Sequence, residues 1–490
     1  MPRELITIQV GQCGNQVGVR FWDLALREHA AANPRAVFDE PLSSFFRNVD
    51  SRYDDPLELP LGAGATPIRT LKARAVLVDM EEGVISQLER GPLADLFDAR
   101  QRVTSHAGAG NNWAHGHAVD GPRHADELLE VVRRAAEFCD SLQCFSLVHS
   151  LGGGTGSGVG TFLLPLLADH FPGTFRFVTC LLPGADDDVI TSPYNTLLAL
   201  DQLIDHADCV LPADNGALAH ICARARGGGR GSAGAAAAGA DRTAGADGLS
   251  TVANGGQPGA KLRAFDEANN VVGALLSNLT AGMRFEGSVN VDLNEITTNL
   301  VPFPRLHFLL AAMAPFSAPR TAPSSASSID ALFTDAFAKE SLLLDIRRPS
   351  LALSAAKTLA AAALVRGDVA ISDVSRNLAR LTPALDMAHW NECGFKIGLC
   401  RVSPASQPHA LLALVNSTAF GAVLDEQRRR FDRLYTRRAH VHHYTQFIEL
   451  EQMEHARANV VDLIGEYAAV QSAPPPARVE LPLDRAIALR

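Results

Sequence analysis

One stretch of the sequence has the composition of a phosphate-binding loop. Residues 152–158 read Gly-Gly-Gly-Thr-Gly-Ser-Gly, between an apolar strand expected at 144–148 and a helix expected at 159–170. Backbone N–H groups at a helix N-terminus attract anions, and the hydroxyls of Thr155 and Ser157 add hydrogen-bond donors. This pattern predicts a phosphate cradle, with a flexible turn as the alternative for a glycine-rich stretch.

The absence of lysine from this loop narrows the chemistry. The loop does not fit the GxxxxGK[ST] pattern of P-loop proteins, and it is no clean GxGxxG dinucleotide fingerprint followed by an acidic residue at the end of the next strand. A dehydrogenase is therefore only a remote alternative. Without a lysine, the phosphate charge has to be balanced by the helix dipole and by a metal ion, so we expect magnesium in the site.

Two further loops of small and amide residues resemble this cradle in composition. Residues 11–16, Gly-Gln-Cys-Gly-Asn-Gln, follow a strand expected at 5–10 and open a helix expected at 15–32. Residues 107–112, Ala-Gly-Ala-Gly-Asn-Asn, precede Trp113 and taken alone indicate only a turn. Two glycine-rich turns on one sheet edge favour a nucleotide site more strongly than one does.

Asp79 and Glu81 are candidate metal ligands. They end a strand expected at 73–78, where carboxylates could hold magnesium through water. The alternative is a helix N-cap, because residues 84–88 have a helical pattern. The sequence does not favour one of these over the other.

Cys13 and three histidines are weaker candidates. No base neighbours Cys13 in the sequence, so it is expected to line a pocket rather than to act as a nucleophile. His440, His442 and His443 are too close together to share one helical face, which favours a structural segment over a metal site.

The elements that must position these residues alternate along the first half of the chain. A further strand is expected at 175–182. Short apolar strands followed by helices are typical of a parallel sheet covered by helices, and ligands of such sheets bind at the carboxyl ends of the strands. The candidate loops follow those ends.

Composition limits the possible functions. The 490 residues are enough for two or three domains, and no apolar run approaches a membrane span. The formal charge of −10 argues against nucleic acid as a partner. The first residues do not resemble a signal peptide, and the eight cysteines form no Cys-x-x-Cys pair, which indicates neither disulfides nor zinc and fits a reducing cytosol.

Low-complexity stretches divide the chain. From 227 to 248, 16 of 22 residues are Gly or Ala, which predicts a disordered insertion. A second linker is expected at 317–328, and an amphipathic helical pattern runs from Leu424 to about Val470. The expected units are a phosphate-binding domain at 1–223, the insertion at 224–261, a central helix at 262–285, an intermediate α+β domain at 286–423 and a C-terminal helical region at 424–490.

The three loops, together with Asn-Leu-Val-Pro-Phe-Pro-Arg-Leu-His-Phe at 299–308, resemble the tubulin family between Arg3 and about Tyr467. The 152–158 loop is shared with bacterial division GTPases, whereas the 11–16 and 299–308 strings are specific to tubulins. The resemblance implies an α/β fold with a Rossmann-type GTPase sheet, a central helix, a smaller mixed α+β domain and a C-terminal helical pair. It also implies GTP and Mg²⁺ as ligands and a cytoskeletal polymer as the product.

Segments at 21–29, 43–50 and 187–195 resemble the epsilon class of the family, and an insertion before the central helix fits that class. This resemblance implies a role at centrioles or basal bodies of the centrosome, in building triplet microtubules, with other tubulin subunits and centriole components as partners. Neither a nucleic acid nor a membrane partner is expected. The chain is expected to form hetero- or homo-oligomers.

The family's nucleotide contacts transfer to this chain by resemblance. Asn215 and Asn269 would read the guanine edge, Phe265 would stack on the base, and Glu81, with Asp79 nearby, would hold magnesium. The full expected nucleotide-binding set is Gln12, Cys13, Gly110, Asn111, Ser150, Gly152, Gly153, Gly154, Thr155, Gly156, Ser157, Gly158, Asn215, Phe265 and Asn269. Phe265 stands where most relatives have tyrosine and Ser192 where they have glutamate, so the ribose contacts differ from the family pattern.

Asp292 and Glu295 are the candidate catalytic residues. Three residues apart, they are expected to share one helical face, with a solvated acidic face as the alternative. The resemblance implies that Glu295 enters the nucleotide site of a longitudinal neighbour and positions the attacking water, as in alpha-type tubulins. Two functions follow: a GTPase whose hydrolysis depends on assembly, or a GTP-stabilised structural module that does not hydrolyse GTP.

Overall fold

The computed structural model describes residues 3–33, 40–52, 57–61, 68–184, 187, 189–227, 265–287, 289–316, 329–346, 356–405 and 407–474. The part of the predicted insertion from 228 onward, the predicted linker at 317–328 and the residues after 474 lie outside these ranges. Among the helices of the described ranges, none combines the length and apolar character that a membrane crossing requires.

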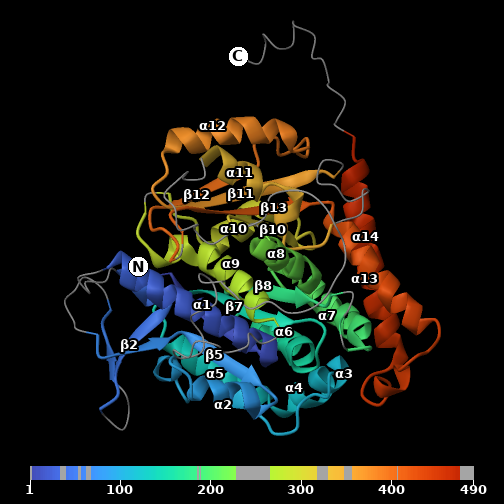
Figure 1. Ribbon diagram of the computed structural model, residues 1–490. Helices are drawn as coiled ribbons and strands as arrows, with labels where there is room; N and C mark the ends of the chain where they lie inside the picture. The colour runs from blue at the N-terminus through green and yellow to red at the C-terminus, as the bar shows by residue number, and fades with distance from the viewer. Residues whose placement is uncertain are drawn as a thin grey trace, which may run out of the picture.

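A six-stranded sheet forms the centre of the N-terminal half (Figure 1). Its strands, in order across the sheet, are β6 (Arg102–Thr104), β5 (Ala75–Asp79), β1 (Glu4–Val10), β7 (Leu142–Ser150), β8 (Phe175–Leu182) and β9 (Cys209–Asp214). All neighbouring strands run parallel. The strand order reverses between β1 and β7, and at such a switch point the carboxyl ends of the strands leave a crevice for a ligand.

Both faces of this sheet are buried, which explains its nearly continuous apolar strands. Ile6 and Ile8 of β1 point to one face, and Leu5 points to the other. The first face packs against α5 (Ala125–Glu137), α6 (Gly160–His170) and α7 (Ser192–His206). The second face packs against α1 (Gly11–Ala32) and α9 (Asp266–Arg284). The predicted parallel, helix-covered sheet is therefore confirmed.

Several boundaries differ from the sequence expectation. The first helix begins at Gly11 rather than at residue 15, so the 11–16 loop is itself the opening of α1. The strand expected at 73–78 is two strands separated at Arg74, whose buried guanidinium lies 2.6 Å from a Glu4 carboxylate oxygen. Residues 224–227 were predicted to belong to the insertion, but they form the end of the helix α8 (Asn215–Gly227).

Smaller elements complete the N-terminal half. The antiparallel sheet β3 (Leu57–Leu59), β2 (Phe46–Asp50) and β4 (Thr70–Ala73) lies beside α1, and the short helices are α2 (Glu82–Glu89), α3 (Trp113–His115) and α4 (Gly121–Arg123).

A second, four-stranded sheet lies on the other side of α9 (Figure 1). Its strands, in order, are β10 (Leu309–Ala314), β13 (Ala410–Ser417), β11 (Thr358–Arg366) and β12 (Phe395–Cys400), and its helices are α10 (Leu293–Leu300), α11 (Ile329–Ala336) and α12 (Ile371–Leu381). Only β11 and β12 pair in parallel, so the sheet is mixed, as expected. The C-terminal helical pair is α13 (Phe420–Tyr435) and α14 (Leu450–Ser472), and α13 begins before residue 424.

A buried cluster of charges joins the two sheets through α9. Glu28 of α1 accepts hydrogen bonds from Arg284 of α9 at 2.7 Å and from Arg366 of β11 at 3.0 Å, and Ser277 donates to the same carboxylate. The three charged side chains are at most 2% exposed. Burial alone would raise the pKa of Glu28, but the two guanidiniums outweigh it and lower the pKa to about 2.

We expect Glu28→Gln to destabilise the fold by about 3–5 kcal/mol, because it leaves two buried guanidiniums without a counter-charge. A folded-state pKa below the ordinary value means that the carboxylate stabilises the fold above about pH 4.5 and loses this effect as the pH falls towards about 2. Urea unfolding followed by circular dichroism measures both effects. The matched control is Glu130→Gln, because the Glu130 side chain lies on the solvent-facing side of α5 and is 44% exposed. Equal stability of the two variants would contradict the role of Glu28.

Candidate nucleotide site

An open cavity of about 280 Å³ lies at the switch point between β1 and β7. Residues from α1, from the 152–158 loop, and from the starts of α8 and α9 surround it. Its lining consists of Gln12, Cys13, Gln16, Asp79, Glu81, Asn111, Ser150, Gly152, Gly153, Gly154, Thr155, Gly156, Leu181, Pro183, Asp187, Val189, Asn215, Phe265 and Asn269. Most of the predicted nucleotide-binding set is thus brought together in one place.

Four helix N-termini lie at this cavity. α1 begins at Gly11, a π-helical turn over Thr155–Val159 leads into α6, and α8 and α9 begin beside Asn215 and Phe265. Each contributes free backbone N–H groups and the positive end of a helix dipole. No lysine or arginine lies among the lining residues that the structure describes. An anionic ligand would therefore be held by amides and by a bound cation.

Glycines allow the three loops to approach one another closely. Gly11 has φ +72°, and a Cβ there would lie 3.0 Å from the backbone nitrogen of Gly156. A Cβ on Gly154 would lie 2.9 Å from the carbonyl oxygen of Ala109 in the third loop. Larger residues at these two positions would separate the loops, so the glycine pattern has a steric reason.

Three residues predicted to contact phosphate are not among those that line the cavity. Ser157 is fully buried, and its hydroxyl donates to the carbonyl of Gly153 within the loop. Gly158 faces the opposite way, because a Cβ there would meet the carbonyl oxygen of Trp113 at 2.6 Å. Gly110 is absent from the lining, although its neighbour Asn111 belongs to it. The π-helical turn directs residues 157 and 158 toward the core, and this rotation is invisible in the sequence.

Asp79 and Glu81 present oxygen atoms to the same cavity. Asp79 is 3% exposed, and its Oδ1 accepts from the Glu81 backbone at 3.3 Å. Its Oδ2 is buried and has no hydrogen-bond partner among the described residues. Burial raises the pKa of Asp79 to about 6. Glu81 stands at the N-cap position of α2, but its side chain forms no capping hydrogen bond. An unsatisfied buried carboxylate beside a second one fits a hard divalent cation.

The described residues contain no group of three or more His, Cys, Asp or Glu side chains able to hold a metal. Protein ligands at this cavity would therefore be few, and phosphate and water oxygens would have to complete the coordination. This is the usual arrangement for Mg²⁺ at phosphate sites.

Phe265 and Asn269 give part of the cavity a lining that suits a planar base. Phe265, at φ +71°, is 60% exposed and precedes α9, so its ring is available for stacking. Asn269 is buried and donates to Gln16 Oε1 at 3.2 Å, which fixes its amide beside the cavity. Cys13 also lines the site, but burial raises the pKa of its thiol to about 12, so it is protonated and not a nucleophile.

Comparison with known proteins identifies the family. The family described as "Tubulin/FtsZ family, GTPase domain" matches residues 4–223, and "Tubulin C-terminal domain" matches residues 304–428. The chain is 47% identical over 472 residues to the tubulin epsilon chain of Homo sapiens, covering 94% of this chain and 95% of that one. Identity is 46% over 496 residues to the tubulin epsilon chain of Mus musculus, covering 96% and 97%. This chain belongs to the tubulin family.

The tubulin beta-2 chain of Suillus bovinus is also similar, but at 32% identity over 485 residues, covering 96% of this chain and 97% of that one. The resemblance to the epsilon class is thus confirmed. The chain is a tubulin-type GTP-binding subunit of the cytoskeleton, with other tubulin subunits as its partners.

In this tubulin an acidic residue that sequence reasoning missed lies near Ser192. Ser192 is buried, and its hydroxyl donates to Asp187 Oδ2 at 2.9 Å. Asp187 lines the cavity and lies beside Gly152. Asp187 therefore supplies a carboxylate at the cavity edge where Ser192 has none. The run of aspartates at 186–188 was the available signal for it.

Asn195 of α7 is a second residue that the sequence did not reveal. Its side chain is fully buried, and its Nδ2 donates to the carbonyls of Asn111 and Gly152, both at 2.8 Å. Its Oδ1 accepts from the Trp113 backbone at 2.9 Å and from the Tyr444 hydroxyl at 2.6 Å. One amide thus ties the third loop, the 152–158 loop and the segment between α13 and α14 together.

The two candidate catalytic residues lie apart from this cavity, and their predicted common helical face is wrong. Asp292 precedes α10, caps it by accepting from the Glu295 backbone at 2.6 Å, and is paired with Arg3. Its carboxylate is therefore committed to the fold. Glu295 lies in the first turn of α10, with its side chain 40% exposed and one oxygen 3.3 Å from Lys396 Nζ.

We expect Asn195→Ala to weaken GTP binding at least about tenfold, because it leaves two loop carbonyls and a backbone N–H unpaired beside the cavity. Tyr444→Phe, which removes one bond from the same amide, should give a smaller loss. Titration with a fluorescent GTP analogue measures both. The control is Thr196→Ala, whose buried hydroxyl makes only a 3.4 Å contact with Leu151; equal effects at 195 and 196 would contradict the role of Asn195.

Proposed function

We propose that this chain is an epsilon-class tubulin that binds GTP with Mg²⁺ and acts in the assembly of centrioles or basal bodies and their triplet microtubules. The observation that carries the nucleotide part is the convergence of three loops and four helix N-termini on one cavity. The cellular part rests on the similarity to epsilon chains over nearly the whole length. Imaging of the tagged chain in cells tests the cellular part, and we expect the chain to localise to centrioles, basal bodies or elsewhere in the centrosome.

Asp79 and Glu81 are the proposed ligands of Mg²⁺, directly or through water. The bound ion would neutralise phosphate charge that the described lining, lacking lysine and arginine, leaves unbalanced. Asp79 is suited to this because its Oδ2 has no partner in the described part of the chain and because burial makes its negative charge unfavourable without a counter-ion. Residues 152–156 would bind the phosphates through their amides, and Asn215, Asn269 and Phe265 would hold the guanine.

Lowering the pH from about 7.5 to about 5.5 should weaken the Mg²⁺-dependent part of GTP binding about fourfold, because a group with a pKa of about 6 is ionised above that pH and protonated below it. Asp79→Asn should remove this pH dependence and most of the Mg²⁺ effect. Nucleotide affinity measured across a Mg²⁺ titration at both pH values tests it. Asp95→Asn, away from the cavity, is the control; an unchanged Mg²⁺ response in Asp79→Asn would exclude these ligands.

We further propose that Glu295 completes the GTP site of a longitudinal neighbour. Glu295 is half-exposed and lies outside the cavity of its own chain, so any contact that it makes with a nucleotide would be with that of another subunit. The loop after α10 presents Phe303, 45% exposed, in edge contact with the 41% exposed ring of Trp390. Exposed aromatic pairs of this kind favour protein contacts. In that contact Glu295 would orient a water molecule or accept its proton.

A specific contact also supports the second function, a GTP-stabilised structural module without hydrolysis. Lys396 Nζ lies 3.3 Å from Glu295 Oε1 and competes with water for that oxygen. If this pairing persists after assembly, the carboxylate is a poor base. Chromatographic identification of the nucleotide in protein purified with its assembly partner distinguishes the two: GDP indicates turnover, and GTP indicates the structural module.

For the hydrolysing form, Glu295→Ala should reduce assembly-dependent GTP hydrolysis by about a hundredfold or more, as loss of a water-positioning group does, while GTP affinity stays unchanged. Single-turnover phosphate release from assembled protein measures the first, and nucleotide titration of the unassembled chain measures the second. Thr298→Ala, exposed on the same helix, is the matched control. Unchanged hydrolysis in Glu295→Ala would refute this role.

A further inference from the structure

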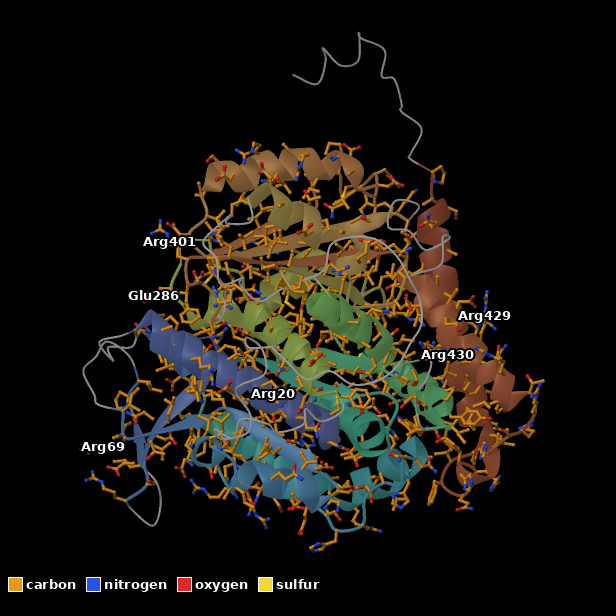
Figure 2. All side chains as sticks on the ribbon, viewed as in Figure 1. Arg20, Arg69, Glu286, Arg401, Arg429 and Arg430 are labelled. Carbon is orange, nitrogen blue, oxygen red and sulfur yellow. The ribbon has the colours of Figure 1, made fainter. Side chains whose placement is uncertain are left out.

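An ion pair joins α1 and α9 beside the part of the cavity that Phe265 and Asn269 line. Arg20 lies on α1 where that helix runs beside α9 (Figure 2), and its Nη2 is 3.0 Å from Asp266 Oδ1. The two side chains are only 17% and 15% exposed, so water and salt screen this pair less than they screen pairs on the open surface. Neither residue lines the cavity, and none of the proposed nucleotide contacts uses the pair.

The two helices approach each other closely at Arg20. A Cβ on Gly273 of α9 would lie 2.9 Å from the Cβ of Arg20, so the stem of the arginine rests against α9. Asp266 precedes Gly273 by seven residues and therefore lies on the same side of α9. The Arg20 side chain thus runs back along α9 to the first turn of that helix. One turn earlier on α1, Gln16 Oε1 accepts from Asn269 Nδ2 at 3.2 Å. Two contacts with α1 therefore hold the start of α9.

Phe265, directly before Asp266, has an unusual backbone conformation. Its φ of +71° lies in the left-handed region, which a residue with a Cβ rarely adopts and which persists where the surrounding structure imposes it. The Phe265 carbonyl accepts from the Asn269 backbone at 2.8 Å, and the Phe265 ring is 60% exposed, so burial of the ring does not fix the residue. On the helix side, the backbone of Phe265 is held by this hydrogen bond and by the ion pair of the next residue.

We propose that Arg20 and Asp266 are positioning residues for the base of the bound nucleotide. Their ion pair holds the first turn of α9 against α1, and that turn keeps Phe265 in the conformation that presents its ring to the cavity. The inference rests on the proposed GTP site, in which Phe265 stacks on guanine. It places a determinant of base stacking outside the residues that line the cavity.

The pair is not suited to binding phosphate itself. One positive charge faces one negative charge, so the two largely cancel at a distance, and Arg20 is absent from the cavity lining. Loss of the pair should therefore change how the base is bound and leave the phosphate and Mg²⁺ contacts as they are.

The test uses the full chain, with GTP and GDP affinities measured by competition with a fluorescent GTP analogue. We expect Asp266→Asn and Arg20→Gln each to weaken binding of both nucleotides about fivefold, as loss of one charge-assisted contact does. The ratio of GTP to GDP affinity should stay within about twofold of the wild-type ratio, because both nucleotides carry the same base. Arg20→Lys, which keeps the charge, should recover most of the affinity lost in Arg20→Gln.

Asp373→Asn is the matched control. Asp373 also lies in the first turn of a helix, α12, and its Oδ1 is 3.0 Å from Arg376 Nη1. The substitution thus removes an ion pair of the same length at the same helical position, but in the part of the chain that carries the second sheet. Nucleotide affinities of this variant should equal those of the wild-type chain.

A double-mutant cycle tests whether Asp266 acts through Phe265. In a Phe265→Ala background, Asp266→Asn should change GTP affinity less than about twofold, because the ring that the ion pair positions is gone. A merely structural ion pair would give the same loss in both backgrounds. Unfolding temperatures of all variants verify that the fold is intact.

Three results would overturn the inference: an unchanged GTP affinity in Asp266→Asn, a loss of equal size in both backgrounds, or a loss that differs between GTP and GDP. Absence of GTP binding by the wild-type chain is a separate result, since it would refute the proposed GTP site itself and the inference with it.

Discussion

The hydrogen bonds of the Asn195 side chain hold loops from distant parts of the chain around the candidate nucleotide cavity, and the rest of this site depends on them. A lysine in the lining would neutralise phosphate by itself, but the described lining has none. The alternative is an array of backbone amides, and such an array acts only if the loops keep their relative positions. A neutral, fully buried amide with two donors and an acceptor can fix several backbone groups without adding charge.

The same molecule uses the opposite solution between its two sheets. There, Glu28 is buried with two arginines, and each charge is acceptable only because the others are present. Glu28 lies on α1, Arg284 on α9 and Arg366 on β11. If the N-terminal sheet and the mixed sheet separated, these buried charges would therefore lose their partners. α1 connects the two devices, since its first turn lines the cavity and its last turns carry Glu28. A structural change at the cavity therefore involves the same helix that carries Glu28 of the buried charge cluster.

How much the sequence revealed depended on whether the determining interaction was local. The strand at 175–182 and the phosphate loop between strand and helix were predicted from short patterns, because periodicity and glycine spacing act over a few residues. The inward rotation of Ser157 and Gly158 was missed because a π-helical turn replaces the expected α-helical start. Asn195 was missed because its four partners lie in three other segments, and nothing around it in an apolar helix distinguishes it from an ordinary buried residue.

Asp292 and Glu295 illustrate the same limit in another form. Their spacing is correct for a shared helical face, yet the helix begins one residue later, and this makes Asp292 the cap and leaves Glu295 as the available carboxylate. A cap satisfies the helix that presents Glu295, so the first acid positions the second. Glu295 in turn has no access to its own cavity and is paired with Lys396. If Glu295 acts on a neighbouring subunit as proposed, its chemistry depends on what that subunit does to the ion pair, and assembly would then be the switch between GTP binding and GTP turnover.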